Sequence, residues 1–320
     1  MVAFDGPLIL DPIEWRLTLE RREERARGEP APRRWNDVVD MVAGSAVLPA
    51  TPGNLFASGI NFSWHLQSST IRAAVLRRPL AYMCWGIGYH RGIRRLLGKI
   101  VLRAARVVFV NDAQTAEEVR ELAGIAPQRL PYVVDTDFFT FDPGLKREDF
   151  LFCPGANDRD GDVLLALARR GFRVVWLNNH PELAVRYAGQ DSNLTIVSRP
   201  SFCELRDYYR RCAAVVQPFL RDIHAAGQTT ALEALASGAP VILGHGRTAT
   251  LFAEDGLVDV VRGSDPEEWA RVIQRALDRE RSDPALAASR TELIAGRHAV
   301  DRVAEKLSEG LRRVWGTGHG

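Results

Sequence analysis

The sequence has few cysteines and no long apolar run. Four cysteines are scattered over 320 residues, without the CxxC spacing of a zinc or redox site, so a reducing cytoplasm is the expected compartment. Asp5, Asp11 and Glu14 interrupt the apolar stretch near the N-terminus, and no run of about 18 apolar residues could span a bilayer. We therefore expect neither a secretion signal nor a transmembrane helix.

Acidic residues are absent from one long interval, between Asp40 and Asp112. Nine basic residues lie in it: Arg72, Arg77, Arg78, Arg91, Arg94, Arg95, Lys99, Arg103 and Arg106. Within 91–106, the apolar residues Ile93, Leu96, Leu97, Ile100, Val101 and Ala104 recur at helical spacing opposite Arg95, Lys99 and Arg103. Such a helix either contacts an anionic membrane surface or a lipid-phosphate acceptor, or docks on a sheet with a solvated basic face. No nucleic-acid motif accompanies the charge, so we expect no nucleic-acid partner.

Length and composition predict a soluble globular protein of two domains. The chain is 46% hydrophobic and 26% charged, with a net charge of +2. Strands are expected at 38–42, 80–85, 107–111, 150–153, 173–177, 194–197, 213–216, 240–243 and 258–261, alternating with helices. The alternation indicates an α/β fold, with domains at 1–142 and 143–300 and a final helix and tail at 301–320. No first strand or glycine loop is evident near the N-terminus, so the N-terminal domain is either reduced or diverged.

The segment 209–243 is the most informative. A buried strand, a loop, a helix that opens at Gly227, a glycine stop at Gly238 and a second buried strand form a βαβ unit of a parallel sheet. The loop and the helix start should lie at the carboxyl edge of the sheet, where free N–H groups favour an anion such as a phosphate. Glu233 lies too deep in the helix to cap it. It is either a solvated acid or an acceptor for ligand hydroxyls.

Three motifs in order resemble those of retaining glycosyltransferases with the GT-B fold. They are the segment 209–243, the linker-like 132–139 and the strand and glycine turn 150–155, and the resemblance covers about 105–265. It implies two Rossmann-like domains facing a cleft. It also implies that a sugar is transferred, with retention of configuration, from a UDP- or GDP-sugar. The acceptor would be a saccharide, a lipid-linked molecule or a small molecule. No DxD run or His/Asp cluster occurs in a suitable loop, so metal-independent transfer is expected.

The resemblance also implies roles for single residues. Glu233 would bind the ribose hydroxyls. The diphosphate would contact Arg159, after the turn at Gly155, and the start of the helix at Gly227, Gln228, Thr229 and Thr230. Arg199 would contact the base or a phosphate, Asp222 and His224 would face the sugar, and His90, or otherwise His65, would contact the acceptor. The alternatives are a surface acid for Glu233, loop charges for the other ionisable donor-side residues, and a structural role for the histidine.

Two departures from the pattern leave other functions open. Ala225 stands where many members have a second glutamate, and no lysine closely follows Arg159. The chain is therefore either a divergent enzyme with Arg-Asp and Gly-Gln-Thr-Thr motifs or a non-catalytic partner subunit of another transferase. A sugar-nucleotide epimerase fits the motifs less well. A nicotinamide enzyme is disfavoured because no Gly-x-Gly-x-x-Gly follows an early strand.

Overall fold

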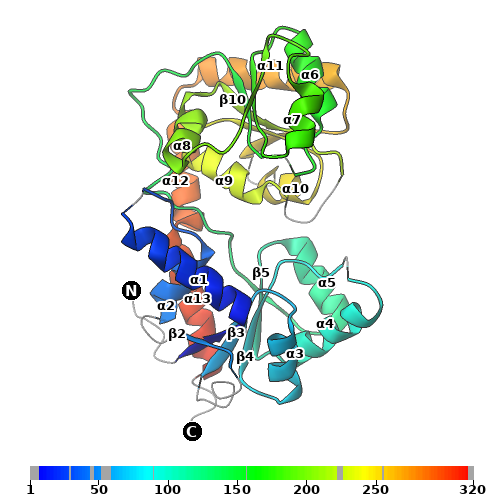
Figure 1. Ribbon diagram of the computed structural model, residues 1–320, viewed down its shortest axis with the longest axis vertical. Helices are drawn as coiled ribbons and strands as arrows, with labels where there is room; N and C mark the ends of the chain where they lie inside the picture. The colour runs from blue at the N-terminus through cyan, green and yellow to red at the C-terminus, as the bar shows by residue number, and fades with distance from the viewer. Residues whose placement is uncertain are drawn as a thin grey trace. The chain divides into compact units, whose positions relative to one another are not determined.

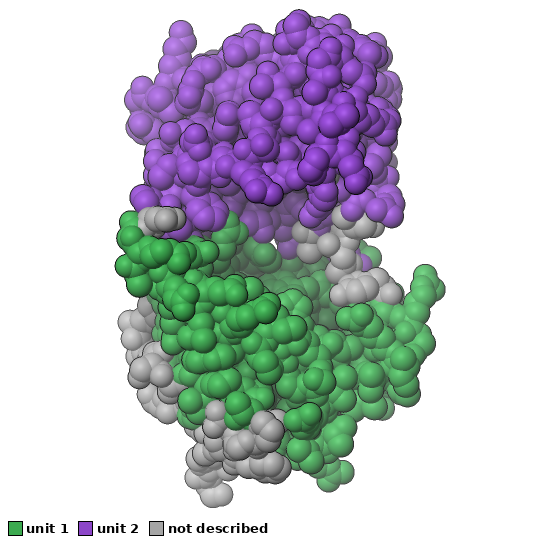
Figure 2. All heavy atoms as spheres, viewed as in Figure 1, with its two compact units in different colours: residues 1–29, 33–133, 298–320 green, residues 30–32, 134–297 purple. Residues whose placement is uncertain are grey.

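A computed structural model describes residues 7–28, 30–43, 47–51, 59–88, 90–155, 157–221, 226–253 and 256–315. The chain forms two compact units (Figure 2). Unit 1 comprises residues 1–29, 33–133 and 298–320, and unit 2 comprises residues 30–32 and 134–297. The units thus change at 133–134 and 297–298, where the sequence suggested 142–143 and 300–301.

Unit 1 contains a parallel sheet with helices on both faces (Figure 1). Its six strands in the described ranges have the order β2-β1-β3-β4-β5-β6. They are β1 (Leu8–Leu10), β2 (Val47–Pro49), β3 (Ile60–Ser63), β4 (Leu80–Cys84), β5 (Val107–Val110) and β6 (Gln128–Arg129). The helices are α1 (Pro12–Ala26), α2 (Trp35–Ala43), α3 (Ser68–Val75), α4 (Gly92–Ala104), α5 (Ala113–Ala123) and α13 (Val300–Trp315). An N-terminal domain with this sheet is not reduced.

The two faces of this sheet belong to separate cores. In β4, Ala81 and Met83 join the core that α2 and α13 cover, whereas Leu80, Tyr82 and Cys84 join the core under α4 and α5. This alternation is the period of two that a strand imposes, and burial on both faces explains why β4 is a continuous apolar run. Gly310 lets α13 approach β5 closely, since a Cβ there would lie 2.5 Å from the Phe109 ring.

The expected strand at 38–42 is wrong, because these residues lie in α2. Val38, Val39 and Val42 are fully buried on one side of that helix. Tertiary packing therefore overrides the β-propensity of valine. Nothing in the sequence indicated β1 either, a strand of only three residues that ends at Leu10, just before Asp11, the N-cap of α1.

Unit 2 contains a second parallel sheet, again with six strands in the part described, in the order β12-β11-β10-β7-β8-β9. The strands are β7 (Leu151–Cys153), β8 (Val174–Leu177), β9 (Leu194–Val197), β10 (Ala214–Gln217), β11 (Val241–Gly244) and β12 (Val258–Val261). The helices are α6 (Gly161–Arg169), α7 (Pro181–Tyr187), α8 (Phe202–Arg211), α9 (Gln228–Ala236), α10 (Arg247–Ala253), α11 (Pro266–Ser282) and α12 (Leu286–His298). Every strand expected in this half is present, whereas α12 was not foreseen.

The strand orders place a switch point in each sheet. From β7 the chain adds β8 and β9 on one side and then β10 on the other, and from β1 it adds β2 on one side and β3 on the other. Ligands of open α/β sheets bind at the carboxyl ends of the strands flanking such a point. No helix in the described ranges has the length and apolar character needed to cross a membrane.

Candidate functional site

The predicted donor residues gather at the carboxyl ends of β7 and β10, the switch point of unit 2. The loops that follow these strands are pinned together by two backbone hydrogen bonds. The Asp160 N–H donates to the Pro218 carbonyl at 2.9 Å, and the Leu220 N–H donates to the Asp158 carbonyl at 2.9 Å. The Asp160 side chain caps α6, accepting from the N–H groups of Asp162 and Val163. The loop carrying Arg159 is therefore fixed at both ends.

Arg159 is a buried cation, only 5% exposed. Its guanidinium donates to the carbonyls of Pro154 and Asn157 and to the Gln217 Oε1 at 3.0 Å, using four of its five N–H groups. It also lies 4.6 Å from the centre of the Phe219 ring. Burial lowers the pKa of Arg159, and no described carboxylate forms an ion pair with it. A buried cation without a paired carboxylate favours an anionic ligand.

Gln217, at the end of β10, was missed by the sequence reasoning. It is fully buried, and its Oε1 accepts from both Arg159 and the Thr230 hydroxyl, the latter at 3.2 Å. Its Nε2 has no hydrogen-bond partner among the described residues. Buried N–H donors rarely lack a hydrogen-bond partner, and an acceptor atom of a ligand would provide one for this Nε2. The available signal was a glutamine that ends an apolar strand.

Gly227 fixes the start of α9 against this cluster. Its φ is +79°, and a Cβ there would lie 2.2 Å from the Gln217 Oε1 and 2.8 Å from the Phe219 ring. Both conformation and space therefore require glycine. The first turn beyond it contains Gln228, Thr229 and Thr230, and a first turn directs its N–H groups out of the helix start toward an anion.

Glu233 is buried, 4% exposed, so it is not the solvated surface acid that the sequence left open. Its Oε2 accepts from the Tyr209 hydroxyl at 2.9 Å. Burial, and then the adjacent Glu233 charge, raises the pKa of Tyr209 well above its usual value. Tyr209 therefore remains a hydrogen-bond donor that orients the carboxylate. Neither the sequence pattern nor the motif resemblance singled out this tyrosine.

The other donor-side candidates are less closely grouped. Gly155 has a φ of +82°, and its carbonyl accepts from the Trp176 indole at 2.9 Å. Arg199 is exposed and follows β9, the edge strand, roughly 10 Å across the sheet from β7. Asp222 and His224 lie outside the described residues.

His65 and His90 line one pocket in unit 1, with a volume of about 200 Å³. Trp64 and His65 follow β3, and Trp85 follows β4, so the pocket lies at the carboxyl ends of these strands. His90 is 6% exposed, whereas the His65 side chain is 49% exposed. More of the His65 ring is therefore accessible to a ligand than of the His90 ring, although the sequence favoured His90.

A buried carboxylate, Glu14 of α1, supports His65. Its Oε1 accepts from the N–H groups of Trp64 at 2.8 Å and His65 at 3.1 Å and from the Ser63 hydroxyl at 3.0 Å. The His65 Nδ1 lies 3.4 Å from the same oxygen. Burial raises the pKa of Glu14, and these contacts only partly oppose the rise. Nothing in the helical pattern of 12–26 distinguishes this glutamate from its exposed neighbours.

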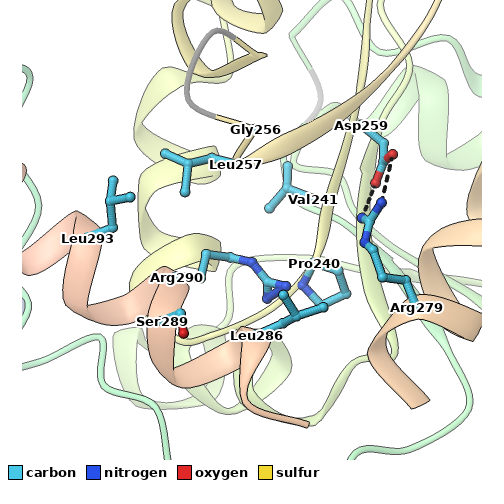
Figure 3. Close-up of a pocket in the computed structure, with 10 residues that line it drawn as sticks. All are labelled: Pro240, Val241, Gly256, Leu257, Asp259, Arg279, Leu286, Ser289, Arg290 and Leu293. Carbon is cyan, nitrogen blue, oxygen red and sulfur yellow. Dashed lines mark hydrogen bonds and ion pairs between the residues drawn. The ribbon is translucent and has the colours of Figure 1, made fainter. Parts of the chain in front are cut away.

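Figure 3 shows a further pocket of unit 2. It has a volume of about 170 Å³ and lies at the amino ends of β11 and β12. Pro240 and Leu257 line it just before β11 and β12. Its two arginines are already compensated, since Arg279 pairs with Asp259 and Arg290 pairs with Glu280. This pocket therefore lacks the uncompensated charge found around Arg159.

Comparison with solved structures confirms the predicted fold class, because structures with the GT-B fold, built from two parallel sheets of this kind, match nearly the whole chain. A glycosyltransferase from Rickettsia africae is 13% identical, with 99% of this chain and 100% of that chain covered and a TM-score of 0.69. HepE of Anabaena, solved with UDP-glucose, is 13% identical, with coverages of 96% and 100% and a TM-score of 0.68. Sucrose-phosphate synthase of Thermosynechococcus elongatus is 17% identical, with coverages of 81% and 74% and a TM-score of 0.66.

No protein-family model and no curated protein matches the sequence. At these low identities the similarity shows the shared fold alone.

Proposed function

We propose that the protein is a glycosyltransferase that moves a sugar from a UDP- or GDP-sugar to an acceptor hydroxyl. The observation that carries the proposal is the pair of buried charges around the start of α9, the Arg159 cation and the Glu233 carboxylate. A nucleotide diphosphate presents anionic oxygens and ribose hydroxyls, which match a cation and a carboxylate respectively. Both groups lie at the switch point, where the fold favours a ligand.

In this proposal the reaction breaks the bond between the sugar and the diphosphate and forms a bond from the sugar to the acceptor oxygen. Arg159 and the first turn of α9 stabilise the negative charge that develops on the leaving diphosphate. Retention and metal independence rest on the motif resemblance. With retention, the leaving phosphate takes the acceptor proton on the same face. Asp222, His224 and Arg199 would contact the donor sugar and base.

The testing experiment measures thermal stabilisation by UDP, GDP, ADP and TDP and by their sugar conjugates. A nucleotide at a hundred times its dissociation constant should stabilise the protein by about 2.7 kcal/mol. Glu233→Gln should weaken binding of the selected nucleotide by about 1–3 kcal/mol, because the ribose hydroxyls lose a charged acceptor. Glu292→Gln, at an exposed position of α12, is the matched control. Equal affinities for both variants would exclude the ribose role.

The alternative function is a non-catalytic partner subunit. It predicts no stabilisation by any nucleotide, or binding without turnover, in a well-folded sample. A selective shift by one nucleotide, followed by transfer or slow donor hydrolysis, would exclude it.

We also propose that α4 contacts an anionic membrane surface, as a peripheral protein of the cytoplasmic face would. The helix buries Gly98, Val101 and Leu102, but Ile93, Leu96 and Ile100 are 71%, 54% and 38% exposed. The apolar stripe expected for this helix is therefore divided between the buried and the exposed side, and half of its residues lie in solvent near the arginines. Val75 and Leu76, at the end of the adjoining α3, are 65% and 46% exposed. Exposed apolar residues among cations are typical of an interfacial helix.

A further inference from the structure

The pocket in unit 1 combines aromatic side chains with positive charge. Six of its lining residues are Trp64, His65, Tyr82, Trp85, His90 and Arg94. It lies at the carboxyl ends of β3 and β4, and β3 flanks the switch point of this sheet. Its position thus follows the same rule as the donor site.

The aromatic side of the pocket is rigid. The Trp85 ring packs edge-on against Trp35 with centroids 5.5 Å apart, and lies 5.2 Å from the Tyr132 ring. Trp64 is 7% exposed and packs on Phe62 at 5.8 Å. Fixed aromatic groups with a few polar groups are typical of a preformed small-molecule site.

The charge of the pocket is positive and is not balanced by acids lining it. Its ionisable lining side chains include His65, His90 and Arg94, and the sequence has no Asp or Glu between Asp40 and Asp112. Arg94 is exposed and forms no ion pair with a described residue. It stands in the first turn of α4, where the helix dipole disfavours a cation unless an anion is close.

Glu14 positions His65 without neutralising the whole pocket. Its Oε1 already contacts Ser63, Trp64 and His65, and the carboxylate is fully buried beneath the strand end. With Nδ1 of His65 held toward Glu14, Nε2 is the nitrogen left for a ligand. Arg94 and His65 can therefore contact an anionic group while the tryptophans contact a sugar ring.

We propose that this pocket binds the acceptor, and that the acceptor sugar carries a phosphate or carboxylate group. The inference rests on the proposed transferase function, because it names the substrate class of the second binding site. The group can belong to a soluble sugar phosphate, a uronic acid or a lipid-linked sugar phosphate. The shared chemistry is an anion attached to a sugar ring.

The test measures binding of glucose, glucose 1-phosphate, glucuronate and inorganic phosphate to the full chain by NMR of the histidine ring signals, with UDP present and absent. We expect glucose 1-phosphate and glucuronate to shift the His65 signal and to bind at least tenfold more tightly than glucose. Arg94→Gln should reduce this preference roughly tenfold, the loss expected for a charge-assisted hydrogen bond. Arg95→Gln, also exposed in the first turn of α4 but outside the pocket lining, is the matched control.

The outcomes separate the two proposals. If UDP binds and glucose binds as tightly as its phosphate, or Arg94→Gln behaves as Arg95→Gln, the anionic-acceptor inference is overturned while the transferase proposal stands. If no nucleotide binds but the charged sugars do, the transferase proposal fails and the pocket remains a charged-sugar site. Binding of inorganic phosphate as tight as that of glucose 1-phosphate would show that the sugar ring contributes nothing and would refute the site. Incorporation into a lipid-linked sugar phosphate in vesicles would distinguish the lipid source from the soluble one.

Discussion

Gly227 is a position where one added methyl group should disrupt the proposed donor site. In Gly227→Ala, the positive φ costs about 1–3 kcal/mol of unfolding free energy, and the Cβ would overlap the Gln217 Oε1 at 2.2 Å. Gln217 and Phe219 would then have to move, and with them the contacts of Arg159. We expect denaturant unfolding to show a loss above that range and UDP binding to fall sharply.

Gly171→Ala is the matched control for this substitution. Gly171 has a φ of +91°, but nothing lies within 4 Å of the position that an added Cβ would take, so the variant tests backbone conformation alone. It should lose stability without losing nucleotide affinity. Equal losses of stability and affinity in both variants would contradict the contact argument.

Glu14 should give the protein a distinctive pH dependence. Because its pKa is raised above the ordinary 4.5, the folded state retains a proton that the unfolded state releases. The free energy of unfolding therefore falls as the pH rises from about 4.5 through the folded pKa, and His65 is the titratable group that faces Glu14. Relative to Glu14→Gln, the wild type should lose stability as the pH rises.

Urea midpoints measured from pH 4.5 to 8 would check this expectation. Glu23→Gln, an exposed position of the same helix, should run parallel to the wild type. A wild type that gains stability over Glu14→Gln with rising pH would refute the assigned direction.

The sequence singled out the candidate donor residues that have local signatures, whose roles stay predictions, and missed residues whose contacts come from other segments. Gly227 and Glu233 stand at fixed places in a βαβ pattern, so their positions could be foreseen. Tyr209 reaches Glu233 from α8, and Glu14 reaches Ser63 from a helix 49 residues earlier. Such pairings depend on tertiary packing, which no local spacing encodes.

The α4 helix should bind vesicles through charge and apolar contact together. Replacing Arg95, Lys99 and Arg103 with Gln should abolish sedimentation with anionic vesicles, because each basic residue near the surface contributes about 1 kcal/mol to the binding free energy. Replacing Ile93, Leu96 and Ile100 with Ser should weaken it even at low salt, because the exposed apolar face would be lost. The control replaces Arg271, Arg275 and Arg281 of α11 with Gln. A wild type that stays in the supernatant would end the membrane proposal.

Elements were predictable where turn residues bounded an apolar run, and not where a short window fitted two kinds of element. The strands of unit 2 were expected within about one residue of their ends, since each is an apolar run bounded by turn residues. Residues 38–42 form a valine-rich window that fits a strand as well as a helix. Burial against α13, some 260 residues later, decides for the helix.

The two units should unfold in separate steps. The described core clusters are confined to one unit each, with two in unit 1 and one in unit 2. UDP at a hundred times its dissociation constant should therefore increase the free energy of unfolding of unit 2 by about 2.7 kcal/mol. In calorimetry the transition of unit 2 should move to a higher temperature, and that of unit 1 should stay in place. Hydrogen exchange would assign each transition. A single transition that moves as a whole would contradict this.

The last helix gives the protein an unusual order of assembly on the ribosome. Val303, Ala304, Leu307 and Leu311 of α13 are fully buried in the core of unit 1, whose other elements precede unit 2 in the chain. During synthesis at about 5–20 residues per second, unit 2 can therefore complete its core first. The apolar face of α2 stays uncovered until α13 has been synthesised. That face is what a chaperone would bind on the nascent chain, and release would coincide with the emergence of α13.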